Sequence, residues 1–159
     1  MPWWGTFVEC NVRLYSVDDE GNHGVVFRSL EASRLVTALA ARWGYRLPYA
    51  WASMSVRQRG DHWWWRSERR HPRGGGSMTL EARVGEQVEP TDLEVFLTAR
   101  WGLHSHAAGR TWWTPNQHPP WPLHTAEVLY LDEDLVHRAG FDARAESMLS
   151  PIFSPGVYT

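Results

Sequence analysis

Residues 7–16 read FVECNVRLYS, and apolar and polar side chains alternate along this stretch. One side of an extended chain would carry Val8, Cys10, Val12 and Leu14, and the other would carry Phe7, Glu9, Asn11, Arg13 and Tyr15. Alternation with a period of two is typical of a β-strand whose two faces have different surroundings. The stretch therefore predicts a strand over residues 7–16.

The same reasoning extends to the rest of the chain. Turn residues separate further predicted strands at 24–30, 50–59, 62–70, 77–84, 103–107, 110–114 and 123–131, and the tail at 154–157 predicts a last extended piece. Helical spacing predicts helices at 33–44, 91–102 and 134–139. In the second helix, Thr91 and Glu94 fit a capping box, and Leu93, Phe96 and Leu97 form its expected buried stripe. We expect one α+β domain over residues 1–159, mainly antiparallel β, whose sheet curls into a partial or closed barrel with two or three flanking helices.

Composition excludes several function classes. All 16 basic residues are arginine, so no lysine is available for a Schiff base, and 16 basic minus 18 acidic residues gives a net charge of -2. Cys10 is the only cysteine, so no intrachain disulfide can form. The sequence contains no apolar run of membrane-spanning length, no signal-peptide pattern and no familiar nucleophile motif. We expect a cytoplasmic protein that contacts no membrane and uses no cofactor.

Several short segments resemble one bacterial family of unknown function, the YqjF-like proteins. The segments are Glu9–Tyr15, Gly24–Ala32, Leu47–Tyr49 with Trp51, Ala52 and Met54, Ser67 with Arg69, Phe96–Thr98 with Arg100, His118–Leu123, and Ser154–Val157. That family is similar in fold to the acetoacetate-decarboxylase-like β-barrels, so the resemblance implies a barrel around a ligand-sized cavity. It does not carry over decarboxylation, because that reaction uses a buried lysine.

The resemblance also bears on the ends of the sheet. YqjF-like proteins usually carry a substantial segment before the Glu-x-Asn-Val-Arg motif, whereas only eight residues precede Glu9 here. We therefore expect the chain to lack the family's N-terminal segment. An unpaired strand edge would result, and a partner subunit in a homo-oligomer would cover it.

The predicted binding site begins with the row Glu9, Asn11 and Arg13. Inside a barrel these side chains would form a polar floor, with Arg13 holding an anionic group and Glu9 acting as acid or base. The resemblance adds Ser67, Arg69, His118 and Trp121 as residues that approach this small-molecule site. Alternatively, the row faces solvent or forms a structural ion-pair network, and the segment around His118 and Trp121 is a structural crossover.

The segment 57–73 supports a different hypothesis. Its six arginines and two carboxylates give a local charge of 6 minus 2, or +4, and three consecutive tryptophans, residues 63–65, lie among them. This composition is typical of single-stranded nucleic-acid binding. However, strand alternation divides the set between two faces, and the net charge of -2 argues against a nucleic-acid partner. The alternative function is thus a non-catalytic interaction domain for a protein or a nucleic acid.

Metal binding has weaker support. His104 and His106 would share one strand face, but no spacing in the sequence requires a third ligand to join them. We therefore predict no metal site.

Overall fold

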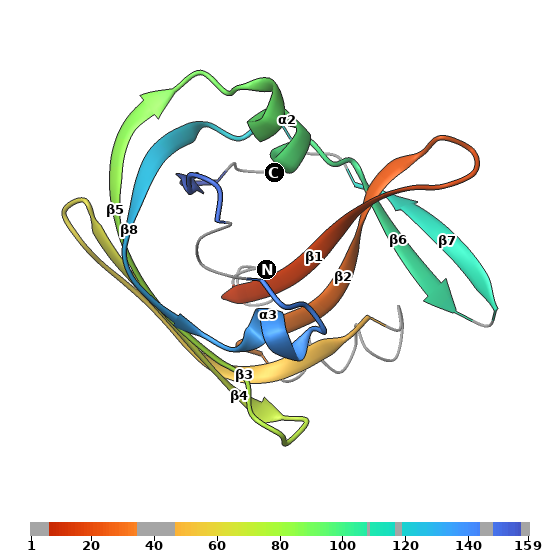
Figure 1. Ribbon diagram of the computed structural model, residues 1–159, viewed down its shortest axis with the longest axis horizontal. Coiled ribbons are helices and arrows are strands. Elements are labelled where there is room, and N and C mark those ends of the chain that lie inside the picture. Colours follow the sequence, from red (N-terminus) through yellow and green to blue (C-terminus); the bar gives the residue numbers. More distant parts are fainter. Residues whose placement is uncertain (1–6, 35–46, 108, 117–118, 144–147, 157–159) are drawn as a thin grey trace, which may run out of the picture.

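The computed structural model describes residues 7–34, 47–107, 109–116, 119–143 and 148–156 (Figure 1). Within these ranges the strands are β1 (Glu9–Val17), β2 (His23–Ala32), β3 (Tyr49–Arg59), β4 (His62–His71), β5 (Ser77–Val88), β6 (Gly102–Ala107), β7 (Arg110–Pro115), β8 (Leu123–Glu133) and β9 (Ile152–Phe153). They form one mixed sheet in the order β7-β6-β2-β3-β4-β5-β8-β9, with β1 paired to β2. The prediction of a mainly β-sheet protein is confirmed.

The sheet is strongly curved but does not close. In Figure 1, β3, β4, β5 and β8 form a curved wall, β1 and β2 lie across from β5 and β8, and the β6–β7 hairpin projects away. Most pairings are antiparallel, but β2 pairs in parallel with both β3 and β6. Strands β7 and β9 end the sheet order among the described residues. That a partner subunit covers an open edge stays a prediction.

One irregularity in the β1–β2 pairing determines where the side chain of Arg28 lies. The register passes from Val12 opposite Ser29 to Arg13 opposite Phe27, so Arg28 is an extra residue in β2. A bulge of this kind bends the strand and changes the direction of the inserted side chain. Arg28 is exposed and lines a pocket described below.

Helix α2 (Asp92–Thr98) begins as the sequence predicts. Thr91 Oγ1 accepts a hydrogen bond from the Glu94 amide, and the Glu94 carboxylate accepts one from the Thr91 amide. The predicted end at Gly102 is wrong, because the backbone leaves helical geometry at Ala99 and Gly102 begins β6. A side chain at Gly102 would collide with the indole of Trp113, so this glycine permits close strand packing.

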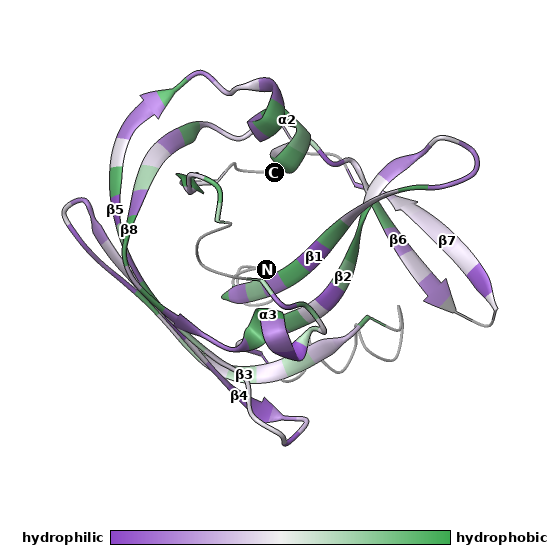
Figure 2. Ribbon diagram, viewed as in Figure 1, coloured by the Kyte–Doolittle hydropathy of each residue, from purple (hydrophilic) through white to green (hydrophobic). Residues whose placement is uncertain are grey.

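The apolar stripe of α2 also differs from the prediction. Leu93 is 49% exposed and Phe96 is 45% exposed, and only Leu97 is partly buried. The reason is position: α2 lies at the rim of the curved sheet and keeps its apolar residues there (Figures 1 and 2). Phe96 packs instead against Tyr15 of β1.

Two other predicted helices have different outcomes. Helix α3 (Leu135–Arg138) is shorter than the predicted 134–139 and buries Leu135. The predicted helix at 33–44 falls mostly outside the described residues. In the described part of the chain, no helix has the length and apolar character needed to cross a bilayer.

The best-buried part of the core lies where β2 meets β3. Residues 29–32 of β2 are all buried, and Ala50 and Ala52 of β3 lie beside them. A parallel strand pair is normally covered on both faces, and small alanines allow that covering to approach closely. Within this apolar region lies one carboxylate, Glu31, which is only 1% exposed.

Candidate functional site

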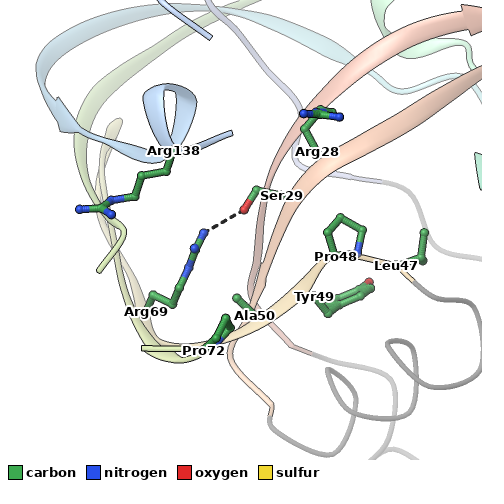
Figure 3. Close-up of a pocket in the computed structure, with 9 residues that line it drawn as sticks. All are labelled: Arg28, Ser29, Leu47, Pro48, Tyr49, Ala50, Arg69, Pro72 and Arg138. Atoms are coloured by element: carbon green, nitrogen blue, oxygen red, sulfur yellow. Dashed lines mark hydrogen bonds between the residues drawn. The ribbon is translucent and has the colours of Figure 1, made fainter. Parts of the chain in front are cut away.

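A pocket of about 430 Å³ opens beside this core (Figure 3). It is lined by Arg28, Ser29, Leu47, Pro48, Tyr49, Ala50, Arg69, Pro72 and Arg138. The three arginines make it a basic pocket by composition. Figure 3 shows the guanidinium of Arg69 directed toward Ser29, whereas that of Arg138 points away from it.

Arg69 is held by a buried carboxylate. Its Nε lies 3.1 Å from both carboxylate oxygens of Glu31, and its Nη2 contacts Glu31 Oε1. Ser29 completes the network, since its hydroxyl donates to Glu31 at 2.8 Å and accepts from Arg69 Nη2 at 3.0 Å. A buried carboxylate needs such partners, because an unpaired buried charge is costly. The charge of Arg69 is therefore neutralised within the protein.

Arg138 is also compensated. Its Nε donates to the carboxylate of Asp134, and its Nη1 donates to the carbonyl of Gly74. Asp134 also accepts from the Ser77 amide. Desolvation opposes ionisation of Asp134, but the hydrogen bonds from Ser77 and Arg138 together outweigh it and lower the pKa of this carboxyl. Arg28 is the pocket's remaining cation, and its Nη2 donates to the carbonyl of Ala139 at 3.4 Å.

A second site is formed by two adjoining pockets of about 340 and 380 Å³. Both are lined by Arg13, Thr98 and Trp121, which lie where the pockets meet. The first pocket also includes Tyr15, Leu97, Leu123, Ile152, Phe153 and Ser154, and the second includes Val25, Phe27, Arg100, Gly102, Leu103, Thr114, Pro115 and Asn116. The described lining of both pockets contains no aspartate or glutamate.

Arg13 is positioned by the end of α2. Its Nη2 donates to the Leu97 carbonyl at 2.9 Å, and the Tyr15 hydroxyl donates to the same oxygen at 3.1 Å. Leu97 lies in the last turn of α2, where backbone carbonyls lack helical partners and favour a nearby cation. Arg13 Nη2 also lies 3.4 Å from the Tyr15 hydroxyl oxygen. The Leu97 carbonyl and the Tyr15 hydroxyl are neutral, so they orient the guanidinium of Arg13 without cancelling its charge.

Arg100 also lies near Tyr15. Its Cζ is 3.7 Å from the ring centroid of Phe96 and 5.6 Å from that of Tyr15, and the Cζ of Arg13 is also 5.6 Å from the Tyr15 centroid. The buried Nη2 of Arg100 has no hydrogen-bond partner among the described residues. Nor does the described part of the chain place a carboxylate within 4.0 Å of either guanidinium. The guanidiniums of Arg13 and Arg100 thus both lie near the ring of Tyr15, and no carboxylate in the described part of the chain offsets their charges.

The wall of the 340 Å³ pocket is aromatic and aliphatic. The rings of Trp63 and Trp65 stack with centroids 5.6 Å apart, and Phe153 lies 5.0 Å from Trp63. Phe153 itself lines the pocket, together with Ile152 and Leu123. The site therefore places apolar surface beside uncompensated positive charge.

The structure divides the predicted site residues among several places. Arg13 and Trp121 lie together, whereas Arg69 belongs to the basic pocket. Glu9 and Asn11 are exposed at the start of β1 and bond to each other, and Glu9 also accepts from the Tyr49 hydroxyl at 2.9 Å. Burial, and then the nearby Glu9, raise the pKa of Tyr49. The polar row therefore does not form a single floor.

The other predicted site residues lie elsewhere. Ser67 is 1% exposed, and its hydroxyl has no hydrogen-bond partner among the described residues. It lies on β4 two residues before Arg69 and lines none of the pockets described above. His118 lies outside the described residues.

Cys10 lies beside the buried carboxylate. Its Sγ is 3.7 Å from the sulfur of Met78. Burial, and then the negative charge of Glu31, raise the pKa of this thiol to about 11. A thiol with this pKa stays protonated at neutral pH, so Cys10 is a poor nucleophile there.

His104 has a structural environment. It is 5% exposed, its Nδ1 lies 2.8 Å from the Ser16 hydroxyl, and its Nε2 lies 3.3 Å from Asp18. Gly24 makes this possible, because a Cβ there would lie 2.7 Å from Nδ1. The hydrogen bonds from Asn22, opposed by desolvation and supported by the bond to His104, lower the pKa of Asp18 to about 2. The histidine therefore ties the β1–β2 hairpin to β6.

His106 is exposed and lies near the hydroxyl of Thr111. No group of three or more histidine, cysteine, aspartate or glutamate side chains suited to a metal ion occurs among the described residues.

Three residues that form the two sites were not predicted from the sequence. Glu31 could have been found, because it directly follows the predicted strand at 24–30, lies between Leu30 and Ala32, and needs a partner if buried. Arg100 could also have been found, because it follows Phe96 by four residues, the spacing at which side chains on one helix face are neighbours. For Tyr15, the sequence pattern indicates only its face of the strand and nothing about a role in the site.

Comparison with known proteins gives a family but no activity. The model of the DUF2071 family, described as an uncharacterised conserved protein, matches residues 1–158. The uncharacterised protein YqjF of Bacillus subtilis (strain 168) is 29% identical over 130 residues, which cover 80% of this chain and 53% of that protein. The chain thus spans about half the length of this curated relative. No solved structure matches, so the likeness to acetoacetate-decarboxylase-like barrels stays a prediction.

Proposed function

The chain belongs to the DUF2071 family of uncharacterised conserved proteins, and we propose that it binds a small molecule with an anionic group and an apolar body between Arg13 and Arg100. The observation that carries this proposal is the pair of guanidiniums without carboxylate partners that line two adjoining pockets. Charged groups in such surroundings gain most from a ligand of opposite charge.

Each part of the site has a role in this binding. The anionic group accepts hydrogen bonds from the guanidiniums of Arg13 and Arg100, each of which lines one or both pockets. The apolar body lies against Trp121, Leu123 and Phe153. Removing apolar surface from water contributes roughly 25 cal/mol per Å² of buried area, so the body adds affinity and the anion fixes orientation.

We further propose that the curved sheet is a partial barrel of the acetoacetate-decarboxylase-like kind. The reaction of that enzyme does not follow, because the chain has no lysine to form a Schiff base. We therefore propose ligand binding without lysine chemistry.

Isothermal titration calorimetry with phenylacetate tests the proposal. Phenylacetate has a carboxylate and an aromatic ring, and phenylacetamide is its neutral counterpart. We expect the protein to bind phenylacetate in preference to phenylacetamide. Arg13→Ala should weaken phenylacetate binding by about tenfold or more, because a hydrogen bond to a charged group contributes roughly 1.5–3 kcal/mol.

The matched control is Arg83→Ala. Arg83 is an exposed arginine whose Nη1 lies 3.0 Å from Glu127. This variant should bind phenylacetate as the unmodified protein does, and circular dichroism would show whether both variants fold. Equal loss in the two variants, or equal binding of the acid and the amide, would contradict the proposed role of Arg13.

A further inference from the structure

A third group of arginines, Arg57, Arg59 and Arg66, lies on strands β3 and β4. Cross-strand pairing places Arg57 of β3 opposite Trp64, and it places Arg66 between Ser55 and Thr79. Directly paired residues project from the same face of an antiparallel sheet. A groove of about 550 Å³, here called the β3–β4 groove, is lined by Ser55, Arg57, Gln58, Arg59, Trp64, Trp65, Arg66 and Thr79.

The arginines of the groove are not paired with carboxylates among the described residues. The neighbouring carboxylates contact residues other than these arginines: Glu68 lies 3.3 Å from Arg70, and Glu81, which pairs with Trp64 across the strands, lies 3.6 Å from His62. For Arg57, Arg59 and Arg66, no carboxylate lies within 4.0 Å in the described part of the chain. The groove therefore presents a positive surface despite the net charge of -2.

The spacing of these charges suits a linear polyanion. Arg57 and Arg59 are alternate residues of β3, so their Cα atoms are roughly 6.6–6.8 Å apart. Arg66 adds a third charge on the neighbouring strand. This separation is comparable with that of successive phosphates along an extended single strand.

An aromatic ring lies among these charges. Trp64 is half-buried and lines the groove, and the ring of His62 lies 5.8 Å from its indole at an interplanar angle of 33°. Bases of any sequence can stack on an exposed aromatic ring, provided that they are not already stacked in a duplex. An acidic peptide would use the arginines but not the indole.

We propose that the β3–β4 groove binds single-stranded nucleic acid, with phosphates on Arg57, Arg59 and Arg66 and a base against Trp64. This site is separate from the pockets at Arg13 in both its residues and its ligand class. The hairpin that carries it ends in hydrophilic residues on the outer side of the curved sheet (Figure 2).

Fluorescence anisotropy with a labelled oligothymidylate of about 12 nucleotides tests this proposal. The logarithm of the association constant should fall with the logarithm of salt concentration, with a slope of about -2 for three phosphate contacts on a single strand. Replacing Arg57, Arg59 and Arg66 together by glutamine should weaken binding about tenfold or more at low salt and bring the slope near zero.

A second variant separates stacking from charge. Trp64→Ala should weaken binding by about fivefold or more and leave the salt slope unchanged, because base stacking involves no counterion release. The matched control Arg83→Gln removes an arginine whose charge is already balanced by Glu127, so affinity should stay within about twofold. Arg13→Ala should also leave oligonucleotide binding unchanged, which distinguishes this site from the proposed anion site.

Three results would overturn the proposal. One is no binding of the oligonucleotide at low salt by the unmodified protein. Another is binding that Trp64→Ala leaves unaltered together with equal affinity for polyglutamate, which would indicate a surface for acidic peptides. The third is equally tight binding of the same sequence as a duplex, since a duplex leaves no free base for the indole.

Discussion

Arg69 and Arg13 are both partly buried arginines beside a pocket, but their partners differ in kind. Arg69 is 17% exposed and paired with a carboxylate that is 1% exposed, whereas Arg13 donates to a backbone carbonyl and a phenol. The first guanidinium offsets a charge that the fold has buried. The second is oriented by neutral oxygens and retains its charge for a ligand. Arginines in similar surroundings can therefore have structural or binding roles, according to what compensates them.

The largest expected effect is on the stability of the compensated site. Arg69→Ala should reduce the free energy of unfolding by about 3–5 kcal/mol, because it leaves Glu31 buried without its partner. Urea denaturation followed by circular dichroism would measure this loss. The double variant Arg69→Met with Glu31→Leu should recover most of it, since apolar residues can replace a buried pair at little cost.

A small loss in Arg69→Ala, below about 1 kcal/mol, would remove the distinction between the two arginines, because that value is typical of exposed ion pairs.

The next expected effect concerns Cys10, which reports on the same buried carboxylate. Its pKa is raised to about 11 from an ordinary value of 9.0, so the folded state binds the thiol proton more tightly than the unfolded state does. The stability that this proton contributes is fully present below pH 9.0 and is lost as pH rises to about 11. The total loss should be about 2–3 kcal/mol, at 1.36 kcal/mol for each pKa unit.

Denaturation of the unmodified protein and of Cys10→Ser across this pH range would isolate the thiol. The variant should lose less stability than the unmodified protein between pH 9 and pH 11. Identical pH profiles would show that Cys10 does not lie in the environment described.

A smaller effect is expected from the helix that orients Arg13. Thr91→Ala removes the cap of α2 and should cost about 1 kcal/mol in unfolding free energy. Thr91 also lowers the pKa of Glu94 through the backbone amide and the hydroxyl, so the contribution of the Glu94 carboxylate is lost as pH falls below its ordinary range. Thr91→Ser is the matched control, because it keeps the capping oxygen, and an equal loss in both variants would contradict capping as the cause.

Local patterns in the sequence predicted the local structure well. Alternation at residues 7–16 and the capping box at Thr91 concern neighbours in the chain, and the structure contains β1 and α2 at these places. The parallel pairing of β2 with β3 and β6 depends on contacts that no local pattern records. The bulge at Arg28 likewise depends on the register of two strands.

The candidate site was predictable only in part, for the same reason. Arg13 and Trp121 were predicted, but Arg100 joins them because α2 ends early and leaves its last turn beside β1. The partner of Arg69 is 38 residues away in the chain, on another strand. The division of the tryptophans between two strand faces was predicted, but their partner was not: Trp63 and Trp65 stack on each other, and Trp63 packs against Phe153.

The most direct test of the difference between the two arginines is a titration with phenylacetate followed by NMR of the arginine Nε–Hε signals. Assignment would come from Arg13→Lys, Arg100→Lys and Arg69→Lys, each of which removes one signal. We expect the signals of Arg13 and Arg100 to shift together with one dissociation constant while that of Arg69 stays in place. A shift of Arg69 alone, or of none of the three at saturating phenylacetate, would contradict this expectation.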